Sequence, residues 1–192
     1  MIKIIDNFLE NSYLKSLQDC FEGNFPWYYT DNISLNQTSD SLSSFGFFHV
    51  FVRNNGPTDS PHISLFAPLF VKMLNVADLK TMLRIRADMT VFSKEKIIHQ
   101  PHNDFLIKTD GLSDKFLTAI FYINDSDGDT VIFNEKRIDD KETEPDLKNL
   151  TIKQQITPKE NRLVLFSGSY IHTGHSPNNH KKRILINANF DI

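Results

Sequence analysis

Two side chains that could bind a metal ion lie two positions apart in the second half of the chain, His102 and Asp104. In an extended strand the side chains repeat every two residues, so both would point to the same side. One further histidine would complete a set of two imidazoles and one carboxylate. That set leaves coordination positions open and is typical of Fe(II) sites for oxygen chemistry. Because a short motif such as His-x-Asp recurs by chance, the prediction depends on residues further along the chain.

Three later histidines are candidates for the third ligand: His172, His175 and His180. Their spacings do not place them on one face of a helix, and Gly174 and Pro177 between them indicate a turn. A turn beside a strand can hold a ligand without distorting the strand. We therefore expect one metal ligand and two loop histidines in this segment, rather than a separate metal site.

The last stretch, residues 183–190, is a predicted strand with a mainly polar face and an apolar face. The first face carries Arg183, Leu185, Asn187 and Asn189, and the second carries Ile184, Ile186, Ala188 and Phe190. If this strand is central, Arg183 points into a cavity, where a carboxylate would pair bidentately with its guanidinium. Arg183 also follows two lysines, and in an exposed basic run it would simply be solvated. The strand alone leaves both interpretations open.

The strands that must position these residues begin at residue 81. Residues 81–92 alternate, and their polar face either meets solvent or lines a cavity. That face carries Arg84, Arg86, Asp88 and Thr90, and the apolar face carries Leu83, Ile85, Ala87, Met89 and Val91. Residues 115–123 are apolar on both faces, which predicts a central strand. The turn at 124–129 leads into residues 130–133 and predicts a hairpin. Two further strands are predicted, at 150–155 and 162–166.

The first part of the chain predicts helices and strands that support this core. One helix follows Asn11 as its N-cap and ends before Gly23, and a second covers residues 64–74 with Pro68 in its first turns. Strands are predicted at 2–5, 25–34 and 45–52, and loops at 35–44 and 136–149. Sixteen phenylalanines indicate aromatic packing between sheets. The fold class is therefore mainly β with supporting N-terminal helices (α+β), as a sandwich or open barrel.

The bulk properties fit one domain over residues 1–192, with 1–80 as support and 81–192 as the barrel core. A chain of 192 residues and 22.2 kDa can bury a substantial core. The net charge of -3 and the pI of about 6.1 argue against a nucleic-acid-binding protein. A single cysteine cannot form an internal disulfide, no signal peptide pattern precedes the first helix, and no stretch is apolar enough to span a bilayer. We expect a cytoplasmic protein.

The order of the motifs resembles the Fe(II)/2-oxoglutarate dioxygenases, and within them the prolyl 4-hydroxylase-like branch. The shared features are His102-x-Asp104, a strand that ends Tyr122-Ile123-Asn124, a Gly128-Asp129-Thr130 turn, then His172 and Arg183. The resemblance implies a double-stranded β-helix, a jelly-roll barrel of the cupin type. It also implies an enzyme that uses Fe(II), 2-oxoglutarate and O2 to hydroxylate a substrate while 2-oxoglutarate is decarboxylated to succinate.

Carried over residue by residue, the resemblance implies that His102, Asp104 and His172 bind iron. Arg183 would receive the distal carboxylate of 2-oxoglutarate, and Tyr122 would add its hydroxyl to that carboxylate. The family's spacing between its distal histidine and its basic residue lies between the spacings of His172 and of His175 from Arg183. Pro177 favours His172, because it follows His172 at nearly the family's proline spacing, and His175 stays an alternative.

Other positions are less directly tied to the chemistry. Phe92 stands where some relatives have a tyrosine that touches the cosubstrate. His99 is interpreted as a loop residue or one that supports a ligand, and His49 and His62 as structural. We hypothesise that the loops at 35–44 and 136–149 flank the iron and select the substrate.

The substrate is predicted only by analogy, as a prolyl or other peptide side chain. A nucleobase, a sugar or a small metabolite is compatible with the same residues. Two other functions remain open: a non-catalytic jelly-roll binding module, and a cupin-type metal enzyme that does not use 2-oxoglutarate. Arg183 disfavours the second, because that enzyme has no distal carboxylate to bind.

Overall fold

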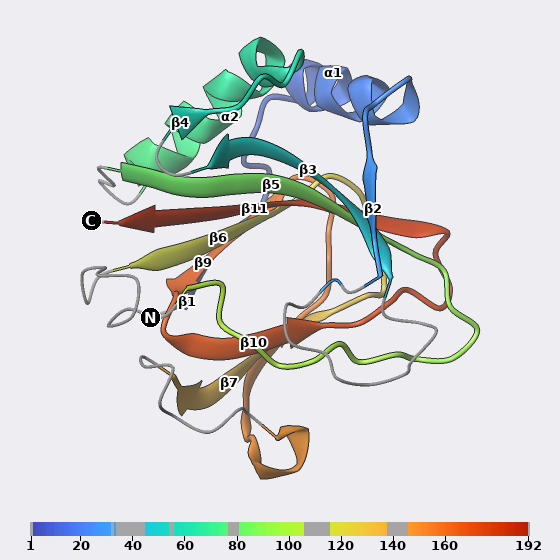
Figure 1. Ribbon diagram of the computed structural model, residues 1–192, viewed down its shortest axis with the longest axis vertical. Coiled ribbons are helices and arrows are strands. Elements are labelled where there is room, and N and C mark those ends of the chain that lie inside the picture. The colour runs from blue at the N-terminus through green and yellow to red at the C-terminus, as the bar shows by residue number, and fades with distance from the viewer. Residues whose placement is uncertain are drawn as a thin grey trace.

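The computed structural model describes residues 2–31, 33, 45–53, 56–76, 81–105, 116–137 and 146–191. Two antiparallel sheets face each other, and both long helices lie on the outer face of the larger sheet (Figure 1). The loop predicted at 35–44, and residues 138–145 of the loop predicted at 136–149, lie outside the described residues. No helix in the described part of the chain is both long and apolar enough to cross a membrane.

The elements along the chain are β1 (Ile2–Ile5), α1 (Asn11–Glu22), β2 (Tyr28–Thr30), β3 (Gly46–Arg53), β4 (Gly56–Pro57), α2 (Ile63–Val76), β5 (Thr81–Val91), β6 (Leu117–Tyr122), β7 (Thr130–Lys136), the short helix η1 (Leu147–Asn149), β8 (Ile152–Ile156), β9 (Arg162–Ser167), β10 (Tyr170–Gly174) and β11 (Lys182–Asp191). The larger sheet has eight strands in the order β1-β9-β6-β11-β5-β3-β2, with β4 paired to β3. The smaller sheet has the order β10-β7-β8.

The two helices form because apolar residues recur on one face of each. In α1 the buried residues are Leu14, Leu17 and Phe21, and in α2 they are Phe66, Leu69, Phe70 and Met73, both at helical spacing. Asn11 is the first helical residue of α1 rather than its N-cap, and Glu10 in the cap position makes no side-chain hydrogen bond. Pro68 is the sixth residue of α2, so it lies beyond the first turn and removes one backbone hydrogen bond.

Phenylalanine rings fill the space between the helices and the larger sheet. The rings of Phe51 in β3 and Phe66 in α2 lie 4.6 Å apart, and Phe21 of α1 lies 5.1 Å from Phe66. The predicted packing of aromatic rings between two sheets is therefore wrong for these residues. The helices bring their own rings to the outer face of the sheet, where they bury more apolar surface than a polar barrel interior would allow.

The polar faces of β5 and β11 lie side by side on the inner face of the larger sheet. Across this pair, Arg183 is opposite Thr90, Leu185 opposite Asp88, Asn187 opposite Arg86, and Asn189 opposite Arg84. The apolar residues of β11 pack against the helix-side core, so the predicted alternation of 183–190 is confirmed. In β5 the alternation fails at Leu83. A bulge there turns Leu83 toward Phe116 and Phe105, away from the helix-side core.

The hairpin predicted between β6 and β7 is wrong. Strand β6 pairs with β11 and β9, whereas β7 pairs with β10 and β8 in the other sheet. As predicted, β6 is a central strand, so neighbours already occupy both of its edges. The turn at 124–129 therefore carries the chain from one sheet to the other, and this crossing places Thr130 opposite β11.

Candidate metal centre

Two of the predicted ligands are brought together by a backbone bridge. His102 lies in the segment between β5 and β6 and pairs with His172 of β10 through two hydrogen bonds, with N–O distances of 2.9 and 3.0 Å. Their ring centroids lie 4.8 Å apart. His172 is thus a strand residue and not a turn residue as predicted, because β10 pairs with β7 as far as Gly174 and the turn begins after it.

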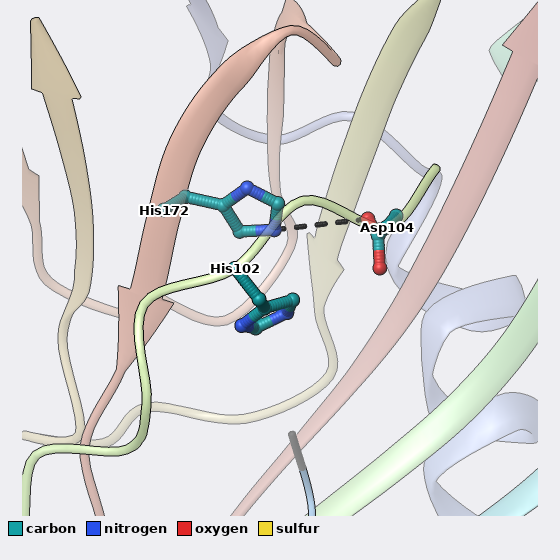
Figure 2. A group of neighbouring side chains, drawn as sticks. All are labelled: His102, Asp104 and His172. Carbon is teal, nitrogen blue, oxygen red and sulfur yellow. Dashed lines mark ion pairs between the residues drawn. The ribbon is translucent and has the colours of Figure 1, made fainter. Parts of the chain in front are cut away.

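Asp104 completes the group from a bend just beyond the bridge. Its Oδ2 lies 3.7 Å from Nε2 of His172, and one ligand atom from each of the three side chains lies within 4.8 Å of the others (Figure 2). Within the described part of the chain, no other three His, Cys, Asp or Glu side chains converge in this way. His175 is not a member, because its Nε2 accepts a hydrogen bond from the backbone N–H of Asp129 at 3.1 Å.

The hydrogen bonds of the two imidazoles orient them for metal binding. Nδ1 of His102 lies 3.0 Å from the carbonyl oxygen of Gln100, and Nδ1 of His172 lies 3.2 Å from that of Tyr170. A carbonyl only accepts, so each Nδ1 carries a proton and each Nε2 is the ring nitrogen left to face a metal ion. Burial, assisted by the neighbouring His172, lowers the pKa of His102 to about 4 and keeps it neutral. This is the protonation state that a metal ligand needs.

Asp104 is buried among donors from the larger sheet. Arg84 donates to Oδ1 at 2.5 Å, and the side-chain amides of Asn187 and Asn189 donate to the carboxylate at 3.1 and 2.9 Å. Burial acts to raise the pKa of Asp104, but the Arg84 guanidinium and the two histidines outweigh it and hold that pKa well below its usual value. The carboxylate therefore stays ionised, and it is anchored to β5 and β11.

Arg183 is buried, with 6% of its surface exposed, so the solvated alternative is wrong. Its Nη2 donates to Oγ1 of Thr130 at 2.7 Å, and its Nε has no acceptor within the described residues. Two glycines leave room for it. A Cβ on Gly174 would lie 2.7 Å from Arg183 Nη1, and one on Gly128 would lie 3.0 Å from Arg183 Cδ.

Thr130 is a site residue whose role the sequence does not predict. Its Oγ1 accepts hydrogen bonds from both Arg183 and the Tyr122 hydroxyl, each at 2.7 Å, so its own O–H is left to donate. Thr130 lines the same pocket as Arg183, whereas Tyr122 is fully buried behind it. Burial raises the pKa of Tyr122, which keeps its hydroxyl a donor. No sequence motif marks this role, because it depends on β7 crossing to the other sheet.

One pocket connects these groups. It is lined by His102 and His172 at one end, by Arg183, Thr130 and Gly174 at the other, and by residues of β5 and Ile33. His99 also lines it, and burial together with the nearby Arg183 charge lowers the pKa of His99 to about 3. Phe92 is 55% exposed and does not line it. His180 lies outside the site, paired with Asp127 at 2.9 Å.

A jelly-roll barrel that gathers two imidazoles and one ionised carboxylate inside it defines the class of two-histidine, one-carboxylate metal proteins. The chain belongs to the 2OG-Fe(II) oxygenase superfamily, whose family model matches residues 90–191. It is therefore an oxidoreductase, a 2-oxoglutarate-dependent oxygenase that uses Fe(II) and O2, and the family assignment made from the motifs is confirmed.

Solved structures share the fold at low sequence identity. A 2OG-Fe(II) oxygenase family oxidoreductase from Burkholderia pseudomallei has a TM-score of 0.66 and 9% identity, covering 99% of this chain and 84% of that one. A prolyl hydroxylase from Trichoplax adhaerens, in complex with a hypoxia inducible factor peptide fragment, has a TM-score of 0.61 and 13% identity, covering 99% and 83%. HygX from Streptomyces hygroscopicus, with nickel, 2-oxoglutarate and hygromycin B bound, has a TM-score of 0.62 and 11% identity, covering 99% and 82%. Comparison with curated protein sequences finds no match to this chain.

Proposed function

We propose that His102, Asp104 and His172 bind the Fe(II) of this oxygenase and that Arg183 receives the distal carboxylate of 2-oxoglutarate. The observation that carries this proposal is the convergence of the three ligand atoms within 4.8 Å, with His102 and His172 lining a pocket whose other end holds a buried guanidinium. Two histidines and one carboxylate fit a divalent metal ion, and Arg183 with an unpaired Nε fits an anion.

Iron and 2-oxoglutarate, when bound, supply the oxidising chemistry that hydroxylates the substrate as 2-oxoglutarate is decarboxylated to succinate. The side chains of this protein bind and orient the metal ion and 2-oxoglutarate. The Nδ1 protons of the two histidines, each donated to a backbone carbonyl, fix the ring orientation. Arg183 and the hydroxyl of Thr130 form the anion-binding end, and Tyr122 acts on it through Thr130.

The substrate proposed from the family likeness is a prolyl or other peptide side chain. The Trichoplax relative is bound to a peptide, which supports a peptide, whereas HygX is bound to hygromycin B, which supports a small molecule. We also propose a cytoplasmic location. The free thiol of Cys20 is compatible with a reducing compartment, and cell fractionation tests this.

The test is anaerobic addition of Fe(II) and 2-oxoglutarate to purified protein, with visible absorption as the readout. A keto acid chelated to Fe(II) gives a weak charge-transfer band. We expect this band in the parent protein, its loss in His102→Ala, and a shift of its 2-oxoglutarate dependence to higher concentration in Arg183→Gln.

Arg162→Gln is the matched control, because Arg162 also belongs to a strand of the larger sheet but pairs with Asp6 at the surface. It should leave the band unchanged. Absence of the band in well-folded, iron-loaded protein would refute the proposed site. That result would instead support the binding module or the metal enzyme that does not use 2-oxoglutarate.

A further inference from the structure

A second set of polar side chains lines the same pocket beside the metal ligands, and two of them, Arg86 and Asp88, have no role in the proposed site. Arg86 and Asp88 lie on the inner face of β5, and Asn187 lies opposite Arg86 on β11. Nε of Arg86 lies 2.6 Å from Oδ1 of Asp88. Its N–H is not directed at that oxygen, so the atom has no hydrogen-bond acceptor within the described residues. The guanidinium is thus ion-paired with Asp88, while its Nε has no aligned acceptor.

Unpaired buried polar atoms gather around this pocket. Within the described residues, five of its lining atoms have no hydrogen-bond partner: Arg86 Nε, Thr90 Oγ1, His99 Nδ1, Arg183 Nε and Asn187 Oδ1. Proteins leave few buried polar atoms unpaired, so such a concentration indicates a polar ligand.

The five atoms fall at two separate places. Thr90 is directly opposite Arg183, and His99 is close enough to feel the Arg183 charge, so these three lie at the end assigned to 2-oxoglutarate. Arg86 and Asn187 face each other four residues further along β11, which is about 13 Å at the rise of an extended strand. Asn187 also donates to Asp104. The second place is therefore beside the metal ligands, at the other end of β11 from Arg183.

The place formed by Arg86 and Asn187 combines a group that binds anions, the Arg86 guanidinium, with an adjacent hydrogen-bond acceptor, Asn187 Oδ1. Cζ of Arg86 lies over the ring of Phe48, 5.9 Å from the ring centroid. The N–H groups of a guanidinium match a planar carboxylate. Asn187 donates its amide to Asp104, so its free Oδ1 can accept an N–H or O–H.

We propose that Arg86 binds a carboxylate of the substrate, and that Asn187 Oδ1 accepts a hydrogen bond from an N–H or O–H group of the same molecule. The inference rests on the proposed function, since it places the substrate next to the ligands His102, Asp104 and His172. Asp88 is a positioning residue that holds Arg86 toward the pocket. The substrate class is then a carboxylic acid with a neighbouring donor, either as a free small molecule or as an acidic residue of a peptide.

The test uses protein loaded with Mn(II) in place of Fe(II) and with 2-oxoglutarate, and it measures paramagnetic broadening of probe resonances in proton NMR spectra. The probes are the free L-amino acids, their N-acetyl derivatives, and their amides, which lack the carboxylate. A peptide source is represented by N-acetyl-aspartate amide against N-acetyl-asparagine amide. The variants are Arg86→Gln, Arg86→Lys and, as matched control, Arg53→Gln, which removes an exposed arginine of β3.

We expect broadening of carboxylate probes and none of their amides. Loss of the charge-assisted pair in Arg86→Gln should weaken the best probe about tenfold or more, with Arg86→Lys intermediate because it keeps the charge, and Arg53→Gln equal to the parent. Broadening of the free acids supports a small-molecule substrate, and broadening of N-acetyl-aspartate amide supports a peptide one.

Three results would overturn the inference while the proposed function stands, as long as the parent binds Mn(II) and 2-oxoglutarate. They are equal binding of acids and amides, absence of binding by any carboxylate probe, and unchanged binding in Arg86→Gln. A loss of 2-oxoglutarate affinity in Arg86→Gln as large as that in Arg183→Gln would also overturn it, by assigning Arg86 to the cosubstrate. A parent protein that binds no 2-oxoglutarate would overturn the proposed function and this inference together.

Discussion

Arg183 occupies a space that exists only because residue 174 has no side chain. A Cβ on Gly174 would lie 2.7 Å from Nη1 of Arg183, closer than such contacts are found. We expect Gly174→Ala to displace the guanidinium and to raise the Kd of 2-oxoglutarate about tenfold or more, the loss typical of a charge-assisted hydrogen bond. Calorimetric titration of Ni(II)-loaded protein with 2-oxoglutarate measures this.

Gly56→Ala is the control for that substitution, because the nearest atom to its added Cβ is 3.9 Å away. Both variants should bind Ni(II) as the parent does, since neither contacts His102, Asp104 or His172. An unchanged 2-oxoglutarate Kd in Gly174→Ala would show that the cosubstrate does not depend on the position of Arg183.

Either His172 or His175 could be the third metal ligand on sequence grounds alone. Only His172 lies with His102 and Asp104, whereas Nε2 of His175 is taken by the backbone of Asp129. We therefore expect His172→Ala to abolish stoichiometric Co(II) binding, and His175→Gln, whose side chain can still accept a hydrogen bond, to retain it. Absorption of bound Co(II) is the measurement, and the reverse pattern would make His175 the ligand.

The helices act on the site only through the sheet they cover. Phe66 of α2 is fully buried and packs on Phe51, on the side of the sheet opposite the metal ligands. Phe66→Ala should lower the free energy of unfolding by about 3–5 kcal/mol, through lost burial and the cavity left behind. Urea titration measures it, and Co(II) binding by the folded protein should stay unchanged.

Val71→Ala on the same helix is the matched control, since Val71 is 51% exposed. Its effect should stay within about 0.5 kcal/mol, as for most surface substitutions. Equal losses for the two variants would mean that α2 does not pack as described.

For the strands and helices, the sequence predicts the features that depend on local residue pattern, and it misses the features that depend on which strands pair with each other. The alternation of β11 identifies its inner face, and the all-apolar pattern of β6 identifies a central strand. The bulge at Leu83 and the crossing from β6 to β7 leave no local signal, because each is decided by which strand occupies the neighbouring edge. The observed helix boundaries differ from the predicted ones by a residue or two, because cap residues are only weak signals of where a helix begins or ends.

Over the whole molecule, stability should depend on pH through two buried histidines. Burial lowers the pKa of His99 to about 3 and that of His102 to about 4, whereas an unfolded histidine titrates near 6.5. Between about pH 6.5 and pH 4 the unfolded chain therefore binds protons that the folded chain does not, so acidification favours unfolding. The metal-free protein should lose about 1.4 kcal/mol per pH unit for each histidine in this window.

Urea unfolding of metal-free protein at a series of pH values tests this dependence. In His99→Gln the titration of this histidine is removed, so the slope should be smaller than the parent's. A free energy of unfolding that stays level from pH 7 to pH 4 would mean that neither histidine is buried in its neutral form.

The candidate site was predictable as a set of residues but not as an arrangement. Spacing alone marked His102 and Asp104, and motif order added His172 and Arg183. The supporting roles of Arg84, which pairs with Asp104, and of Thr130 depend on register between distant strands, which no local pattern encodes. That residues 1–192 form one oxygenase domain stays a prediction.

The origin of the three ligands in both sheets has a mechanical consequence. His172 belongs to the smaller sheet, whereas Asp104 is tied by Arg84 and Asn187 to β5 and β11 of the larger one. A metal ion held by both residues is a cross-link between the two sheets. Loading with Ni(II) at 100 times its Kd should add about 2.7 kcal/mol to the free energy of unfolding and slow hydrogen exchange of the β10 amides. The same metal ion would then serve the reaction and hold the two sheets together, so that loss of iron loosens the barrel as well as stopping the reaction.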